Sequence, residues 1–290
     1  MKGSGQRSRR ACLPFIVLAS LVYPMLGTAG EDLSLSLKNQ YQGKVLTLRH
    51  FFKGSSLAFS RDGSLTGPAE VGPWTTDGEI QVLKIDWKDQ EVKIHARRIL
   101  LAFDENKKSL RDFLEVVREW KPLKRGEIEQ VLLANEVHID IAVPATSPPY
   151  SELEAAINSV FLSESEFLVD FIPEFWSDYF KRGSNPLTTV RYSDEPVYRV
   201  TMGGMTAPRV IQTENPKPSA EALRAKYHPI VMLSVVVDSK GSAREIGILT
   251  PAGMGLDEKA IEAVGKWKFQ AATKNGKPVA TIIAVEVDFN

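Results

Sequence analysis

The spacing of apolar residues predicts an α+β protein with two folded parts. Short apolar runs separated by turn residues fill residues 44–97, a pattern typical of a small antiparallel β domain. Helical spacing replaces it between residues 109 and 182. Residues 207–290 then predict a helix, two paired strands, a second helix and a long final strand. Strands and helices that are segregated in this way are typical of the α+β class.

Length and composition fit this organisation. The chain has 290 residues, of which 43% are hydrophobic and 25% charged, so it is long enough for two ordinary globular domains. We divide it into a signal peptide at residues 1–30, a β-rich α+β domain of unknown function at 31–182, a linker at 183–206 and a two-layer helix and antiparallel-sheet domain at 207–290.

The charge balance argues against a nucleic-acid partner. The chain has 36 basic and 36 acidic residues, and no basic face or RNA-reading motif stands out. Residues 1–30 contain four basic residues and no acidic one. Their removal would leave 32 basic against 36 acidic residues, a net charge of −4.

The amino terminus predicts export. Basic residues precede an apolar run at residues 11–26, and small residues follow at 27–30, so we expect a secretory signal cleaved after Ala29 or Gly30. The alternative is an uncleaved membrane anchor, although the run of 16 residues is shorter than the roughly 20 of a spanning helix. The sole cysteine, Cys12, lies in this segment. A mature chain would therefore form neither a disulfide nor a cysteine metal site.

The first domain is expected to begin with strands. Apolar runs at residues 44–50, 57–60, 80–85 and 92–97 predict a small antiparallel sheet or a partly open barrel. A helix is predicted from Ser109 to Trp120, with Leu110, Phe113, Leu114 and Val117 on one face. A strand follows at residues 137–143. Ser151 and Glu154 have the spacing of a capping box, which predicts a second helix there.

An aromatic cluster between Phe167 and Phe180 has two interpretations. An exposed cluster would indicate a surface that binds a ligand or touches a membrane. We favour burial of these rings against the β domain, because aromatic residues at helical spacing usually form core. The cluster is followed by Lys181 to Pro186, which predicts the end of the helix.

The second domain has clear turn and cap signals. An apolar strand at residues 230–237 is followed by a turn that ends at Gly241 and by a strand at 243–250. Asp257 is expected to cap a helix with Ala260, Val264 and Trp267 on one face. Asn275 and Gly276 predict a tight turn before the final strand at 279–289.

Several phrases of this domain resemble the carboxy-terminal domain of the TonB family. They are Ala207 to Ile211, Glu221 to Lys226, Gly253 to Val264, Trp267 to Phe269 and Ala272 to Val279, in the family's order. The chain departs from the family in two places. Pro216-Lys-Pro-Ser219 lacks the tyrosine of the usual Pro-x-Tyr-Pro phrase, and Tyr227-His-Pro229 replaces the usual glycine before the next strand.

The resemblance implies a binding module of the Gram-negative cell envelope. Such domains face the periplasm and bind extended segments of outer-membrane transporters by adding a strand to an open sheet edge. The final strand is the expected edge, with the partner-binding residues Val279, Thr281, Ile282, Ile283, Ala284, Val285 and Val287. The alternatives are that this strand is central, or that it pairs with a second copy in a homodimer.

We expect no enzymatic activity, no cofactor and no metal. Nucleophile-elbow, phosphate-loop and zinc-helix motifs do not occur. His138 and Asp140 would share one face of a strand, but no third ligand is near them in sequence and such positions normally face water. An envelope hydrolase is therefore the least favoured function.

Two functions remain after this exclusion. The leading one is an exported periplasmic protein that binds a protein partner and supports transport across the outer membrane. The alternative is a short energy transducer held in the inner membrane by an uncleaved amino-terminal helix. A transducer that crosses the periplasm resembles an anchor joined to its terminal domain by a long Pro-rich spacer, whereas the 17 prolines here are scattered.

Overall fold

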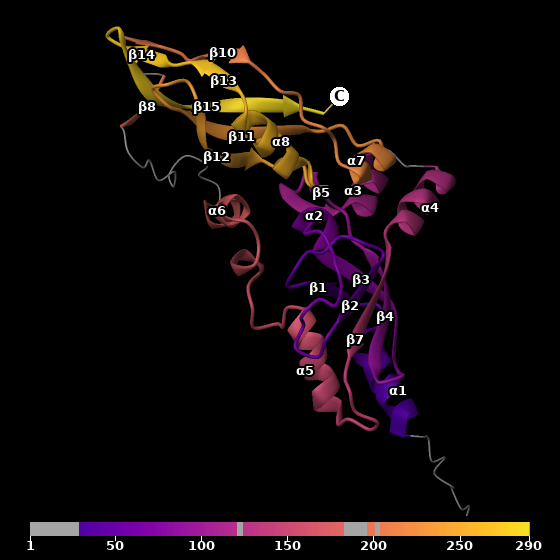
Figure 1. Cartoon of the computed structure of the whole chain (residues 1–290). Helices are drawn as coiled ribbons and strands as arrows, with labels where there is room; N and C mark the ends of the chain where they lie inside the picture. Colours follow the sequence, from indigo (N-terminus) through magenta and orange to yellow (C-terminus); the bar gives the residue numbers. More distant parts are fainter. Residues whose placement is uncertain (1–28, 121–123, 183–195, 201–203, 290) are drawn as a thin grey trace, which may run out of the picture.

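The computed structural model describes residues 29–120, 124–182, 196–200 and 204–289. The molecule is elongated, with one sheet formed by the first part of the chain and another formed by the C-terminal strands (Figure 1). Helices and separate sheets together confirm the α+β class.

The first sheet has the strand order β1-β3-β4-β7-β2. Its strands are β1 (Val45–Thr47), β2 (Ser56–Phe59), β3 (Glu79–Lys88), β4 (Glu91–Arg98) and β7 (Glu136–Ala142). β2 runs parallel to β7, whereas the other pairs are antiparallel. The prediction of a purely antiparallel sheet is therefore wrong at this edge. A parallel neighbour needs a long crossover, and residues 60–135 provide it.

Helix α1 (Ala29–Tyr41) packs on β3 and was not predicted. Its contacts are specific: Lys38 forms a 2.7 Å ion pair with Asp86, and the Ser34 hydroxyl donates to the Trp87 carbonyl at 3.2 Å. Leu37 is fully buried. The short helix α2 (Trp74–Asp77) places Trp74 in the core and leads directly into β3.

The helix predicted from Ser109 begins four residues later. Residues 109–112 form β6 (Ser109–Asp112), which pairs with β5 (Leu101–Asp104). The helix itself is α3 (Phe113–Trp120), and α4 (Arg125–Ala134) follows it. Leu110 fits the helical spacing, but its backbone pairs with β5. In the first turn of a helix, the backbone N–H groups would have no such partner.

Helix α5 (Tyr150–Val160) confirms the second predicted helix but not its cap. Pro149 is the N-cap residue and makes no side-chain hydrogen bond, so Ser151 lies inside the helix. The short η1 (Leu168–Asp170) and α6 (Glu174–Arg182) follow.

The aromatic cluster of η1 and α6 is buried in part. Trp176 is fully buried, whereas Phe167 is 72% exposed and Phe180 is 40% exposed. Trp176 has Trp74, Tyr179 and Phe180 as ring neighbours. The predicted burial therefore holds at the centre of the cluster and fails at its two ends. The strand that α6 packs against is β12 (Ala243–Thr250) of the second sheet, not a strand of the first sheet as predicted.

The second sheet follows the path β12-β11-β15-β14-β9, with β8 also paired to β15. Its strands are β8 (Val197–Arg199), β9 (Met205–Thr206), β11 (Ile230–Val237), β12 (Ala243–Thr250), β14 (Ala272–Lys274) and β15 (Lys277–Asp288). A separate ribbon joins β10 (Arg209–Gln212) to β13 (Lys268–Gln270). The hairpin predicted around Gly241 is present, and Gly241 has a φ of +81°.

Two helices belong to this second part. Helix α7 (Ala220–Ala225) is capped by the Ser219 hydroxyl, which accepts from the Ala222 amide at 3.0 Å. Helix α8 (Leu256–Gly265) begins after Gly255, so the prediction that Asp257 caps it is wrong. The Asp257 carboxylate accepts instead from the amides of Ala252 at 2.9 Å and Gly253 at 2.7 Å, which fixes the loop before the helix.

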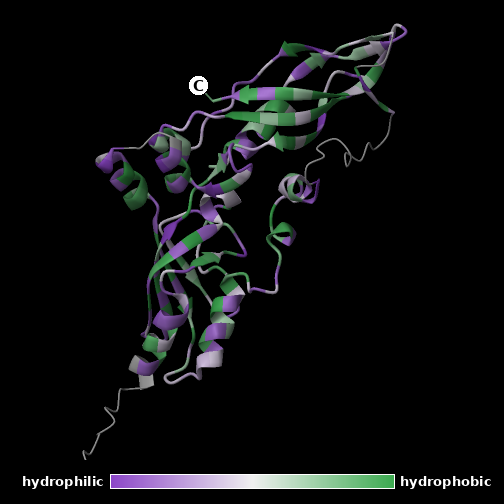
Figure 2. Ribbon diagram, turned by 180° about the vertical axis from the view of Figure 1, so that it is seen from behind, coloured by the Kyte–Doolittle hydropathy of each residue, from purple (hydrophilic) through white to green (hydrophobic). Residues whose placement is uncertain are grey.

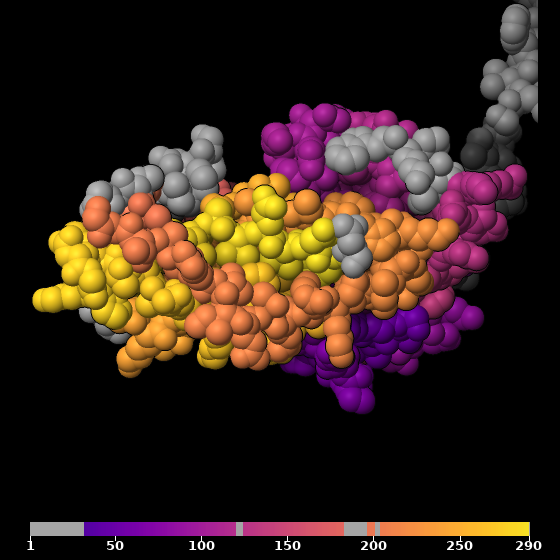
Figure 3. All heavy atoms as spheres, turned by 90° about the horizontal axis from the view of Figure 1, so that it is seen from above, coloured from indigo at the N-terminus to yellow at the C-terminus, as the bar shows by residue number. Residues whose placement is uncertain are grey.

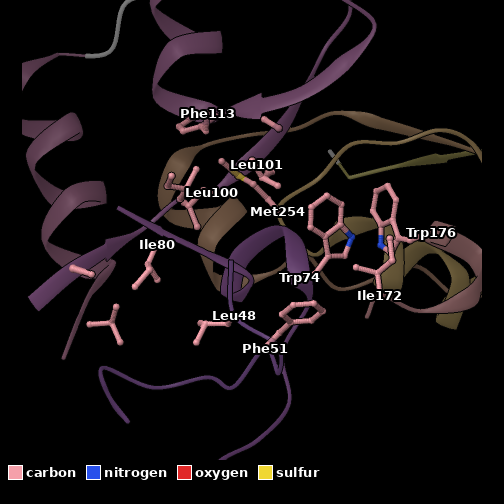
Figure 4. Packing of buried hydrophobic residues seen from close by; sticks show 14 of the residues in the cluster. Leu48, Phe51, Trp74, Ile80, Leu100, Leu101, Phe113, Ile172, Trp176 and Met254 are labelled. Carbon is pink, nitrogen blue, oxygen red and sulfur yellow. The ribbon is translucent and has the colours of Figure 1, made fainter. Parts of the chain in front are cut away.

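The two parts share one hydrophobic core. Met254 lies beside Leu100, Leu101 and Trp74 in Figure 4, so the loop before α8 packs into the first part of the chain. Hydrophobic residues run through the strands of both sheets (Figure 2).

The predicted linker contains two of the strands. β8 and β9 lie within residues 183–206 and pair with β15 and β14, while residues 183–195 and 201–203 lie outside the described residues. The domain boundaries themselves stay a prediction.

Candidate functional site

The candidate site is the edge of β15, the strand predicted to bind a partner. β11 pairs with it from Thr281 to Asp288. β14 pairs with residues 277–279, and β8 runs parallel to residues 280–282. From Ile283 onward, β11 is the one strand that pairs with β15 among the described residues. Since every strand has two edges, one edge of β15 has no partner strand over this second half among the residues that the structure describes.

This arrangement narrows the predicted site. Val279, Thr281 and Ile282 already have neighbours from this chain on β14 or β8. Thr281 is fully buried as well. Ile283, Ala284, Val285 and Val287 lie beyond the end of β8 in the register. The expectation that the final strand is an edge therefore fails at Thr281 and Ile282, which have β11 on one side and β8, from the predicted linker, on the other.

The turn at the far end of β11 identifies the backbone groups on the open edge. The amide of Asp238 donates to the carbonyl of Ser242 at 3.0 Å, so even-numbered residues of β11 direct their backbone groups toward β12. Odd-numbered residues such as Val235 then face β15 and pair with its odd-numbered residues. The amides and carbonyls of Ala284 and Glu286 therefore point to the open edge. Sequence reasoning missed this alternation, because it depends on the register with β11.

Side chains of this half-strand alternate in burial. Val285 and Val287 are 8% and 2% exposed and belong to the main core, whereas Ala284 and Glu286 are exposed. In the space-filling view from above, the yellow residues of the C-terminal strand reach the surface of the second sheet (Figure 3). The half-strand thus combines an anchored inner face with an exposed outer face.

The edge strand β12 is less suited to receive a peptide. α6 packs against it, and the Arg182 guanidinium donates to the Ile248 carbonyl at 3.5 Å. Its ladder with β11 is interrupted by two register shifts, and Glu245 has a φ of +43°. Bulges of this kind protect natural sheet edges against strand addition.

β10 is a second exposed strand. Its four residues are all exposed, with Val210 at 49% and Ile211 at 68%. It pairs with β13 through a ladder that contains a register shift. Four residues offer a shorter edge than the second half of β15.

The predicted pair His138 and Asp140 lies on the first sheet, remote from this edge in the fold. His138 stacks on His95 with ring centroids 4.6 Å apart, and His95 lies 3.4 Å from Glu136. No group of three or more potential metal ligands occurs among the described residues.

Little of the predicted signal peptide lies within the described residues. Ala29, the predicted cleavage residue, is the first residue of α1, and residues 1–28 lie outside the described residues. No described helix combines the length and hydropathy that crossing a membrane would need. The signal peptide and its cleavage therefore stay predictions.

Comparison with known proteins places the second part of the chain in a family. Residues 214–290 match the family described as Gram-negative bacterial TonB protein C-terminal. Two curated relatives, both called Protein TonB, come from Xanthomonas campestris pv. campestris strains B100 and ATCC 33913. Each is 36% identical to this chain over 75 residues, which is 26% of this chain and 34% of the relative. The chain therefore spans about a third of the length of these relatives.

Proposed function

Since residues 214–290 are a TonB C-terminal domain, we propose that this protein binds an extended segment of an outer-membrane transporter and supports transport across the outer membrane. The binding mode is strand addition to the second half of β15. In this mode, backbone hydrogen bonds supply affinity and alternate side chains supply specificity.

The edge beside Ala284 and Glu286, with which no strand of the described residues pairs, supports this proposal. β11 holds the opposite edge of β15 in register, so the exposed groups are already arranged as a strand. An incoming peptide would pair with a preformed template and would lose conformational entropy only on its own side.

We also propose a non-enzymatic role in the periplasm after export. This part rests on the family resemblance and on the signal-like residues 1–30. Sequencing the mature amino terminus separates it from the anchored transducer. A chain that begins at Gly30 or Glu31 supports export, whereas a chain that retains residues 1–30 and sediments with inner membrane supports the anchor.

Proline substitution on the open edge tests the binding mode. The Ala284 amide points away from β11, so Ala284→Pro removes one outward donor and leaves the β11 ladder intact. The immobilised full-length protein should capture transporters from detergent-solubilised outer membranes, and Ala284→Pro should lose this capture. Ala284→Val keeps the amide and is the matched control.

Two further results would redirect the proposal. In the first, folded Ala284→Pro captures transporters as well as the parent protein does, while Ile211→Lys loses this capture. That result would assign the binding site to β10 instead of β15. A homodimer through β15 would appear as a concentration-dependent mass in analytical ultracentrifugation that Ala284→Pro reduces to the monomer.

A further inference from the structure

A cleft of about 600 Å³ lies where the first part of the chain meets α8. Its walls include Phe51, Phe52 and Phe171, together with Trp74 from α2 and Glu258 from α8. This volume is within the range of small-molecule sites, and an apolar wall with a few polar groups is their usual composition. None of the residues that line the cleft belongs to β15.

Two buried polar atoms of the cleft walls have no hydrogen-bond partner among the described residues. They are the Trp74 indole Nε1, a donor, and the Glu258 Oε2, an acceptor. Trp74 as a whole is only 3% exposed. A buried polar group without a partner costs roughly 1–3 kcal/mol, so a native structure that keeps two of them in one cleft calls for an explanation.

Trp176 contacts both of these residues. The indole of Trp176 donates to the other oxygen of Glu258 at 2.8 Å, and the ring centroids of Trp74 and Trp176 are 5.3 Å apart in an edge-on arrangement. Figure 4 shows the indole nitrogen of Trp74 on the side of its ring that faces Trp176 and Ile172. The indole N–H of Trp176 thus has a hydrogen-bond acceptor in Glu258, whereas the indole N–H of Trp74 has none in the described part of the chain.

A hydroxyl group that entered between the two atoms could satisfy both of them. Its oxygen can accept from the Trp74 N–H while its proton is donated to the Glu258 Oε2 atom. The surrounding Phe51, Phe52 and Phe171 favour an aromatic body for the molecule that carries this hydroxyl.

The charges around the cleft favour an anion at its outer end. Arg49, Lys53 and Lys259 line the cleft, against the carboxylates of Glu70 and Glu258. Arg49 and Lys53 are held by Glu166 and Glu70 at 2.6 and 2.8 Å. The Lys259 ammonium has a longer contact of 3.6 Å with Glu262, which leaves it the cation best able to pair with a ligand.

We propose that this cleft binds a small aromatic hydroxy acid, with its hydroxyl between Trp74 and Glu258 and its carboxylate at Lys259. Because the walls come from both parts of the chain, an occupant would also tie α8 to the first part of the molecule. Binding to the folded state alone raises the unfolding temperature.

Nuclear magnetic resonance of the whole chain tests this proposal with 4-hydroxyphenylacetate as the probe. The chain has five tryptophans, and Trp74→Phe identifies the indole signal of Trp74. The probe should shift that signal saturably and raise the melting temperature. Phenylacetate, which lacks the hydroxyl, should bind at least about tenfold more weakly, as expected for the loss of a buried hydrogen bond.

Matched variants separate the site from general destabilisation. Glu258→Gln keeps one acceptor oxygen for Trp176 but replaces the second oxygen by an amide donor, so it should weaken binding of the probe about tenfold or more. Glu262→Gln, on the same helix but outside the cleft, should bind as the parent protein does. If Trp74→Phe fails to fold, the proposal is still tested by the affinity of Glu258→Gln for the probe and by the comparison with phenylacetate. An unmoved Trp74 signal at saturating probe, or equal binding of phenylacetate, would overturn the proposal.

Discussion

The amide of Met254 donates a 2.8 Å hydrogen bond to the carbonyl of Leu101, which joins the loop before α8 to β5 of the first part. The Phe103 amide returns a 3.0 Å bond to the Ala252 carbonyl. Between them, Gly253 has a φ of +83° and lies against the Leu101 backbone. The TonB C-terminal domain is thus attached to the rest of the chain by backbone pairing, in addition to side-chain packing.

Gly253→Ala should therefore destabilise the protein by about 2–4 kcal/mol in urea unfolding, because it adds both a strained φ and a steric clash. An added Cβ would meet the Leu101 carbonyl, so the junction with β5 would have to open. Gly126→Ala is the control, since no atom outside its own helix lies within 4 Å and its φ is not positive. Equal unfolding midpoints for the two variants would contradict the role assigned to this junction.

Arg98 should be far more sensitive than an exposed arginine. Its buried guanidinium donates to the carbonyls of Phe52, Gly54 and Asp77 and lies 3.1 Å from the Asp77 carboxylate. Arg98→Leu leaves these acceptors and a buried charge without compensation, so we expect a loss of about 3–5 kcal/mol. The measurement is the free energy of unfolding in urea.

Arg224→Leu provides the comparison for Arg98. Arg224 pairs with Glu221 at 3.0 Å on an exposed helix face, where ion pairs contribute about 1 kcal/mol or less. A similar loss in both variants would show that burial of the Arg98 guanidinium does not carry the effect.

Local signals made much of the second part of the chain predictable. The apolar run at residues 230–237, the positive-φ glycine at 241 and the Asn275-Gly276 turn each specify structure through neighbouring residues. All three appear as predicted. The prediction that Asp257 caps α8 was wrong for a tertiary reason. Its side chain accepts hydrogen bonds from the amides of Ala252 and Gly253, and the N-cap residue is Gly255, whose φ is positive.

The candidate edge was harder to predict, because it depends on segments distant in sequence. β8 lies about 80 residues before its partner on β15, and three residues with no strong pattern form it. β6 likewise becomes a strand only because β5 is beside it. The cleft residues Trp74 and Glu258 are 184 positions apart, and neither carries a motif that would have singled it out.

Stability should decrease as the pH rises above about 4.5, and Glu258 should account for part of the decrease. Burial raises the pKa of Glu258 above its usual value of 4.5, and the pKa of the neighbouring Asp257 is raised as well. In the unfolded chain Glu258 ionises near 4.5, whereas the folded protein holds the proton to higher pH. The contribution of Glu258 to the free energy of unfolding is therefore complete below pH 4.5, and it is lost as the pH rises through the folded-state pKa of Glu258.

Urea unfolding at pH values from 4 to 8 measures this dependence. Glu258→Gln should flatten the decrease by up to about 1.4 kcal/mol per pH unit over the affected range, while Asp257 leaves a residual slope. Glu262→Gln serves as the control, because its pKa is lowered by Lys266 and its side chain is exposed. Superimposable profiles for the parent protein and Glu258→Gln would refute the assignment.

Hydrogen exchange should reveal the open edge of β15 directly. The amides of Ile283, Val285 and Val287 face β11 and should be protected, whereas those of Ala284 and Glu286 face the open edge and should exchange at least about tenfold faster. Residue-resolved exchange measured by NMR at low protein concentration tests this alternation, and alternate residues of the fully paired β11 serve as the internal control. Protection of all five amides that persists on dilution would mean that another segment of the chain covers the edge, and strand addition there would be excluded. Protection that appears only at high concentration would instead identify a second copy as the occupant, because pairing between two chains follows mass action.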